Sequence, residues 1–164
     1  MRFCFEHTVP LPREVVFAFF ENPERLELLH AGWSKVRLLR HEKQVRVGAQ
    51  TWIEATLGGF VPMVLGFQHT LFEPPVRFGE EAFHGPFSKF AHIHEFHPRG
   101  LDTVVHDLLD IRLPPQYGGE TMVRRIVSPR VVRMFQFRAQ ALGHLVTAGI
   151  VARCAGETVL SKKG

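Results

Sequence analysis

The strongest alternation of apolar and polar positions lies in residues 85–113, GPFSKFAHIHEFHPRGLDTVVHDLLDIRL. Alternation with a period of two indicates a β-strand with one buried face. Two such runs are separated by Pro98-Arg99-Gly100, which predicts a chain reversal. One face carries Phe90, His92, His94 and Phe96 in the first run, and Val105, Asp107, Leu109, Ile111 and Leu113 in the second. Because cross-strand neighbours contact each other, we expect His92, His94 and Asp107 to share one partly buried surface.

The chain before this hairpin predicts one strand, two short helices and four further strands. Residues 2–9 alternate as a strand, and the helical spacing of Val16, Phe19 and Phe20 predicts a helix from Arg13 to Glu21. Asn22-Pro23 is a typical helix start, so a second short helix is expected after it. Glycine and proline breaks then delimit strands at 36–40, 50–57, 61–72 and 78–84, with a tight hairpin at Gly58-Gly59.

The C-terminal region changes to helical periodicity. From Val131 onward, one stripe at helical spacing carries Phe135, Arg138, Leu142, Leu145 and Gly149. Pro129 is expected to start or kink this helix. An apolar helix without another partner must lie on the sheet, and Arg138 is the one charged position in its stripe.

Size and composition indicate one globular domain over residues 1–164, with 45% hydrophobic residues. Fifteen phenylalanines against one tyrosine suit a packed core or an apolar cavity wall. The two cysteines form no disulfide framework or zinc motif, so a reducing compartment is expected. No signal peptide or membrane-spanning run is apparent, and we expect a cytoplasmic monomer or homodimer with no membrane insertion.

Positive charge is concentrated near the C-terminus. Residues 120–164 carry eight Lys/Arg against two Glu, whereas the rest of the chain carries twelve against fourteen acidic residues. Such a segment suits nucleic acid or an anionic membrane, or simply a solvated helix face. Without a nucleic-acid motif or an aromatic platform, we expect a solvated face and no nucleic-acid partner.

The order of predicted elements is strand, two short helices, about six antiparallel strands and a long helix. The segments typical of one family are Pro10–Pro12 with Glu14–Phe20 and Asn22-Pro23, Gly85-Pro86-Phe87, His92-x-His94-x-Phe96, Thr103 to Asp107, Leu113-Pro114 and Phe135-x-Phe137-Arg138. Together they resemble the START/polyketide-cyclase (SRPBCC) superfamily, in particular its bacterial cyclase/dehydrase-like, ligand-binding members. The resemblance covers nearly the whole chain.

This resemblance implies an α+β helix-grip fold. In that fold a curved antiparallel sheet of about six or seven strands wraps around a long C-terminal helix, and two short helices follow the first strand. Members of the superfamily bind lipids, polyketides, plant hormones or other apolar molecules in a cavity between sheet and helix, and some cyclise or dehydrate polyketides. The resemblance therefore bears more directly on fold than on function.

We expect this protein to bind a small hydrophobic or amphipathic molecule in such a cavity, without a cofactor. The expected ligand-binding residues are His92, His94, Phe96, Asp107, Leu109, Phe135, Arg138 and Leu142.

Other interpretations of the polar residues stay open. In one alternative, these residues form a purely structural hydrogen-bonded cluster. In another, the protein is a cyclase/dehydratase-like enzyme, and His92, His94 and Asp107 supply a His/Asp general acid–base pair. A 2-His-1-carboxylate metal site is a further alternative, but we expect no metal there. An interaction protein would instead have a filled interior and an exposed apolar patch.

Overall fold

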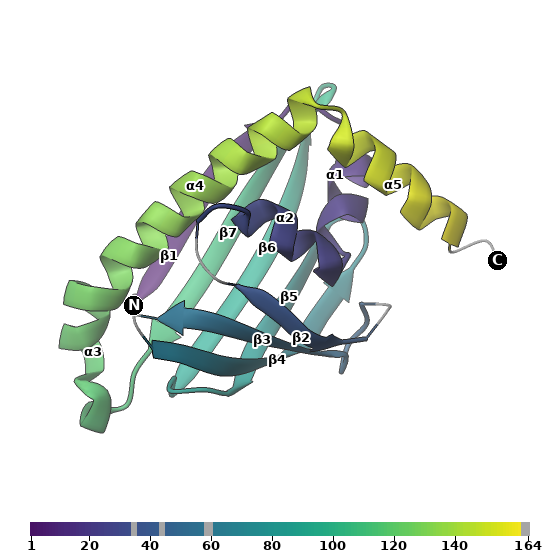
Figure 1. Ribbon diagram of the computed structural model, residues 1–164. Helices are drawn as coiled ribbons and strands as arrows, with labels where there is room; N and C mark the ends of the chain where they lie inside the picture. Colours follow the sequence, from purple (N-terminus) through teal and green to yellow (C-terminus); the bar gives the residue numbers. More distant parts are fainter. Residues whose placement is uncertain (34–35, 43–44, 58–60, 162–164) are drawn as a thin grey trace.

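The computed structural model describes residues 1–33, 36–42, 45–57 and 61–161, so the hairpin predicted at Gly58-Gly59 lies outside the described residues. The described chain forms a seven-stranded antiparallel sheet in the order β1-β7-β6-β5-β4-β3-β2 (Figure 1). The strands are β1 (Arg2–Val9), β2 (Arg37–His41), β3 (Gln50–Leu57), β4 (Val61–Glu73), β5 (Arg77–His84), β6 (Lys89–Arg99) and β7 (Asp102–Arg112).

Helices lie on one side of this sheet. After β1 come α1 (Arg13–Phe20), a 3-10 turn η1 (Pro23–Arg25) and α2 (Leu26–His30). After β7 come η2 (Pro115–Tyr117), α3 (Gly119–Met122), a π-helical segment η3 (Val123–Val127), α4 (Ser128–Thr147) and α5 (Ile150–Ser161). In Figure 1, α4 runs along the β1 side of the curved sheet, and the chain then bends into α5. The expected helix-grip architecture is confirmed.

The central hairpin has the alternation that the sequence predicts. In its register, His94 lies opposite Asp107 and His92 opposite Leu109. Every second residue of β7 from Thr103 to Ile111 is buried. The period of two therefore places the two imidazoles and the carboxylate on the inner, helix-covered face of the sheet.

The reversal predicted at Pro98-Arg99-Gly100 begins at the last of these residues in the structure. Pro98 remains in β6, opposite Thr103, and the chain turns at Gly100 and Leu101, where Gly100 has a φ of +64°. Phe96 donates its backbone N–H to Val76, the last such bond toward β5. Pro98 lies two residues further along, on the same side of β6 but beyond the end of β5. Its lack of an N–H group therefore costs no hydrogen bond between strands.

The C-terminal helical segment continues through Pro129, the residue expected to start or kink it. Helical backbone starts at Gly119, and Pro129 is the second residue of the regular helix α4. Just before it, Ser128 donates its backbone N–H to Val123, five residues back. Proline cannot donate an N–H and its ring crowds the preceding turn, so a wider π turn lets the chain continue through Pro129.

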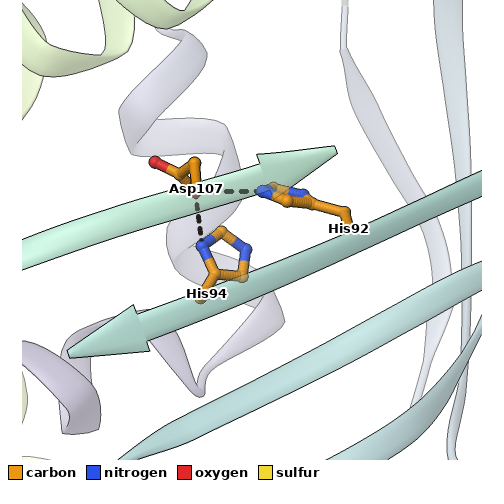
Figure 2. A group of neighbouring side chains, drawn as sticks. All are labelled: His92, His94 and Asp107. Carbon is orange, nitrogen blue, oxygen red and sulfur yellow. Dashed lines mark hydrogen bonds and ion pairs between the residues drawn. The ribbon is translucent and has the colours of Figure 1, made fainter. Parts of the chain in front are cut away.

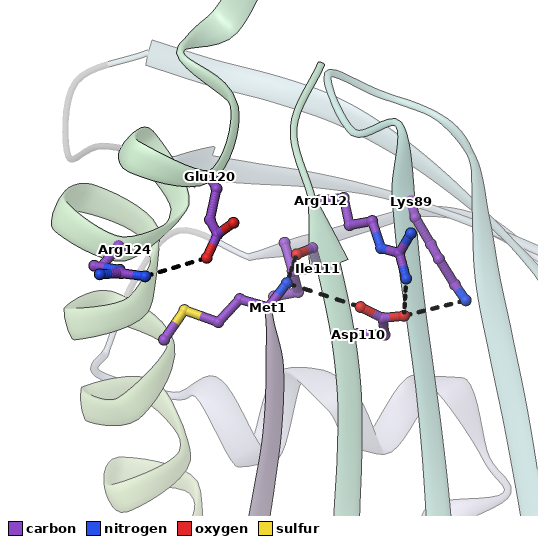
Figure 3. A network of polar contacts seen from close by, with 7 residues as sticks. All are labelled: Met1, Lys89, Asp110, Ile111, Arg112, Glu120 and Arg124. Carbon is purple, nitrogen blue, oxygen red and sulfur yellow. Dashed lines mark hydrogen bonds and ion pairs between the residues drawn. The ribbon is translucent and has the colours of Figure 1, made fainter. Parts of the chain in front are cut away.

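Polar contacts tie the start of the chain to the end of the central hairpin (Figure 3). The Met1 amino group donates to the Ile111 carbonyl at 2.6 Å, which extends the β1–β7 pairing. Asp110 accepts from Lys89 at 3.2 Å and from Arg112 at 3.3 Å on the outer face. These contacts are compatible with the β1–β7–β6 register that positions the buried cluster.

The interior contains two apolar clusters with a polar layer between them. One cluster includes Phe17, Phe19, Phe96, Val105 and Leu142, and the other includes Leu109, Ile111, Val123, Val131 and Phe135. Along β7, Asp107 lies between Val105 and Leu109. Along α4, Arg138 lies between Phe135 and Leu142. The polar side chains of sheet and helix therefore fall at the same level of the core.

Phe19 and Phe83 allow a direct test of this core. Phe19 is fully buried in α1, whereas Phe83 is 47% exposed on β5. We expect Phe19→Ala to lower the free energy of unfolding by about 3–5 kcal/mol, because it leaves a cavity. Phe83→Ala should cost less than about 1 kcal/mol. Urea denaturation measures both, and equal losses would contradict the assignment of α1 to the core.

Candidate functional site

Asp107 is the centre of a buried cluster formed by β6 and β7. Its Oδ1 atom accepts a hydrogen bond from Nε2 of His92 at 2.9 Å. Nδ1 of His94 lies 2.6 Å from the same oxygen, but its direction is not that of a hydrogen bond. Figure 2 shows both imidazoles converging on the carboxylate. All three residues are no more than 5% exposed, so the cluster is shielded from bulk water.

The charge states in this cluster follow from burial and proximity. Burial alone would raise the pKa of Asp107, but the adjacent imidazoles of His94 and His92 hold that pKa well below its usual value. For His94, burial and the neighbouring His92 lower the pKa to about 3, against the opposing influence of Asp107. At neutral pH, the cluster therefore contains an ionised carboxylate and a neutral His94.

A third imidazole approaches the carboxylate from β1. Nδ1 of His7 lies 3.9 Å from Oδ2 of Asp107, and Nε2 of His7 is buried without a hydrogen-bond partner. Burial lowers the pKa of His7, so this ring is also predominantly neutral at neutral pH. The carboxylate on β7 is thus surrounded by three imidazoles from its two neighbouring strands, β1 and β6.

Arg138 reaches the polar layer from α4. Its guanidinium carbon lies 4.9 Å from the centroid of the Phe135 ring, a cation–π contact. Within the described part of the chain, no carboxylate or carbonyl forms a hydrogen bond or ion pair with this guanidinium. Burial lowers the pKa of Arg138, while the more distant charges of Asp107 and Glu80 raise it. The group stays cationic because an arginine pKa starts so high.

Two small cavities meet at Arg138. The larger, about 70 Å³, lies between the sheet, α4 and the η1–α2 segment, and its lining includes Phe20, Leu29, Thr51, His69, His94 and Arg138. The smaller, about 10 Å³, is lined by His7, Asp107, Phe135, Arg138 and Leu142, among others. Arg138, Phe20 and Leu29 line both, so the two cavities are neighbouring parts of one interior region.

The structure distributes the predicted ligand-binding residues over three places. His94 and Arg138 line the larger cavity. Asp107, Phe135 and Leu142 line the smaller one, together with Arg138. His92, Phe96 and Leu109 are buried in the packed core and line neither cavity.

Two histidines that the sequence analysis did not select are part of the interior. His30 and His69 are each 5% exposed, so both are buried. Nδ1 of His30 pairs with the Leu26 carbonyl at 2.9 Å, while Nδ1 of His69 is buried without a partner. A signal for His69 is present in β4, where it follows the buried positions Leu65 and Phe67 at a spacing of two.

Solved structures with the same fold come from bacteria and plants. A Mycobacterium smegmatis protein aligns with a TM-score of 0.69 at 12% identity, covering 90% of this chain and 92% of that one. A Thermus thermophilus protein aligns with a TM-score of 0.66 at 20% identity, covering 91% and 99%. Norcoclaurine synthase from Thalictrum flavum aligns with a TM-score of 0.67 at 15% identity, covering 90% and 86%. At these identities the likeness concerns the fold.

Two further findings bear on the class of protein. No curated protein matches the chain in sequence. No helix in the described ranges is long and apolar enough to cross a membrane.

The model of one family, polyketide cyclase / dehydrase and lipid transport, matches residues 9–138. The matched segment runs from the last residue of β1 to Arg138 in α4, and it includes the central hairpin with His92, His94 and Asp107. The chain therefore belongs to the polyketide cyclase / dehydrase and lipid transport family, a START-like (SRPBCC) family.

Proposed function

We propose that this protein binds a small amphipathic molecule between the sheet and α4, with the polar head group of that molecule held by Arg138. Membership in a family with ligand-binding relatives agrees with this role. The observation that carries the proposal is Arg138 itself. Its guanidinium lines both cavities, yet among the described residues it has no hydrogen-bonding or ion-pair partner. A guanidinium group in this position is suited to bind a carboxylate or a similar hydrogen-bond acceptor.

The remaining cavity groups favour a ligand with one polar end. His94 is neutral at neutral pH because burial and His92 lower its pKa, so it adds no competing positive charge. His69 contributes a buried Nδ1 atom without a partner. Phe20, Leu29 and Phe78 supply the apolar part of the lining. A few placed polar groups in a mainly apolar lining are typical of small-molecule sites.

Acidic side chains set a limit on how strongly the site attracts an anion. Glu21 and Arg25 both line the larger cavity, and their charges offset each other. Glu80 lies in the same wall and weakens the positive field of Arg138. Recognition therefore depends on direct hydrogen bonds to the guanidinium more than on net charge.

The size of the cavity implies that binding moves part of its wall. About 70 Å³ is free, whereas a cavity of about 150 Å³ is known to accept benzene. The short segments η1 and α2 form one side of this cavity, and short helices open more readily than a packed sheet. We infer that α2 moves away from α4 when the ligand enters.

The enzymatic alternative is less well supported by the charge states. His94 lines the larger cavity with Asp107 behind it, which is the arrangement of a general base and its orienting carboxylate. A pKa of about 3 makes His94 a weak base at neutral pH. We therefore place binding before acid–base catalysis.

Naphthoate and naphthylmethanol form a matched pair of probes with one apolar body and different head groups. We expect the unchanged protein to bind naphthoate more tightly than naphthylmethanol. Replacement by Arg138→Gln should weaken naphthoate binding by about ten- to hundredfold, because a charge-assisted hydrogen bond contributes about 1.5–3 kcal/mol. The same replacement should leave naphthylmethanol binding nearly unchanged. Isothermal titration calorimetry measures all four affinities.

Arg133→Gln is the control, because Arg133 is an exposed arginine on the same helix. It should bind both probes as the unchanged protein does. Thermal melting of each variant verifies folding. If Arg138→Gln weakened both probes equally, or if neither probe bound the unchanged protein, the proposed role of Arg138 would be wrong.

Movement of α2 has a built-in reporter in Trp33, which follows this helix. Its ring lies 5.2 Å from that of Phe137 on α4. We expect saturation with naphthylmethanol to change the emission of a Trp52→Phe variant, in which Trp33 is the remaining tryptophan. The naphthalene signal is removed by subtracting the spectrum of a variant that carries both Trp33→Phe and Trp52→Phe and is saturated with the same probe. A spectrum that stays constant while calorimetry shows saturation would contradict opening at α2.

The neutral buried histidines predict loss of stability in mild acid. Burial lowers the pKa of His30 to about 4 and that of His94 to about 3. In the unfolded chain both protonate near pH 6.5, so their stabilising effect is present above about pH 6.5 and is lost as the pH falls. Between pH 7.5 and 4.5 the free energy of unfolding should drop by roughly 2–3 kcal/mol for each group.

Urea denaturation at the two pH values tests this expectation. His30→Gln keeps a donor for the Leu26 carbonyl but cannot titrate, so it should reduce the drop by about 2 kcal/mol. His144→Gln, at an exposed position of α4, should leave the drop unchanged. An undiminished drop in His30→Gln would show that His30 does not remain neutral in the folded protein.

A further inference from the structure

The outer face of the sheet carries a second group of histidines and carboxylates, behind the buried cluster. Because side chains alternate along a strand, Glu95 and His106 point away from the face that holds His94 and Asp107. In the sheet register, Glu95 of β6 lies opposite His106 of β7, which in turn lies opposite Glu6 of β1. His97 follows Glu95 on the same side of β6.

These four side chains already contact one another. Nε2 of His97 lies 3.3 Å from Oε2 of Glu95, and Nε2 of His106 lies 3.1 Å from Oε2 of Glu6. The two imidazole centroids are 4.8 Å apart. The potential ligand atoms of Glu95, His97 and His106 all lie within 4.8 Å of one another. Two imidazoles and one carboxylate from β6 and β7 therefore converge, and Glu6 of β1 reaches the group through its contact with His106.

We propose that Glu95, His97 and His106 form a surface site for a divalent transition-metal ion, zinc by preference, with Glu6 as the fourth ligand. Imidazole nitrogen with carboxylate oxygen is a donor set that zinc accepts in tetrahedral geometry. The two imidazoles favour zinc, nickel or copper over calcium and magnesium, which prefer oxygen ligands alone.

The local geometry permits such a site with small side-chain rotations. Zinc–nitrogen and zinc–oxygen bonds of about 2.0–2.2 Å place adjacent ligand atoms a little over 3 Å apart. The His97–Glu95 and His106–Glu6 separations are already close to that value. His97 is 50% exposed and Glu6 63% exposed, so an ion reaches the site directly from solvent.

The charge balance also favours a cation. The two carboxylates match the charge of one divalent ion. Two arginines lie nearby, but both are engaged elsewhere. Arg77, opposite Glu95, donates to Glu73 at 2.7 Å, and Arg99 donates to Thr8 at 3.0 Å. As exposed hydrogen-bonded pairs, the His–Glu contacts contribute little to stability, so the fold does not depend on them.

Zinc titration of the full chain against a chromogenic zinc indicator tests the proposal. We expect one equivalent to bind the unchanged protein. The double variant His97→Asn with His106→Asn should lower zinc affinity by at least about a hundredfold, since losing groups that merely support metal ligands already costs 10–100-fold. His144→Asn removes an exposed histidine outside this group and should leave the affinity unchanged.

Circular dichroism verifies that the double variant is folded, as expected for substitutions on the outer face. One equivalent of zinc that survives in the double variant would place the ion elsewhere and overturn the proposal. Failure of the unchanged protein to compete with the indicator, or equal losses in the His144→Asn control, would overturn it as well. Because the site lies on the opposite face of the sheet, Arg138→Gln should not alter zinc binding, which separates this test from that of the cavity.

Discussion

The buried carboxylate of Asp107 is the constraint on which the interior depends. An ionised carboxyl group that is 2% exposed is tolerated only when partners stabilise its charge, because an unpaired buried charge is very costly. His92 donates a hydrogen bond to this carboxylate from the adjacent strand, and the neutral ring of His94 packs against the same oxygen. They can do so only in the register that places His94 opposite Asp107. Pairing of the charge and pairing of the strands therefore specify the same arrangement.

This polar layer also explains why the helix and the sheet leave space between them. Arg138 lies on α4 between the buried residues Phe135 and Leu142, level with the cluster on the sheet. Its guanidinium packs against the Phe135 ring and forms no ion pair with Asp107. Opposite charges thus face a common interior without direct contact. An interior of this kind is stabilised by a ligand that supplies the missing hydrogen bonds.

Much of the fold and the centre of the site could be predicted from the sequence, because both depend on short-range periodicity. Alternation along β6 and β7 identified His92, His94 and Asp107, and the helical stripe identified Arg138. His69 was missed although the alternation of Leu65 and Phe67 along β4 extends to it, because that pattern indicates burial and does not indicate that this part of β4 lies near Arg138. The predicted turn included Pro98 and Arg99 as well as Gly100, but both stay in β6, because proline is acceptable where β5 has ended. The local sequence of one strand does not indicate where its neighbouring strand ends.

The central claim is that the interior between sheet and α4 receives a ligand whose head group pairs with Arg138. A crystal structure of the protein saturated with naphthoate tests it most directly. The account predicts the carboxylate within hydrogen-bonding distance of the Arg138 guanidinium, the rings against Phe20 and Leu29, and α2 displaced from α4. A cavity that stays closed, with naphthoate bound only at the surface, would contradict the account.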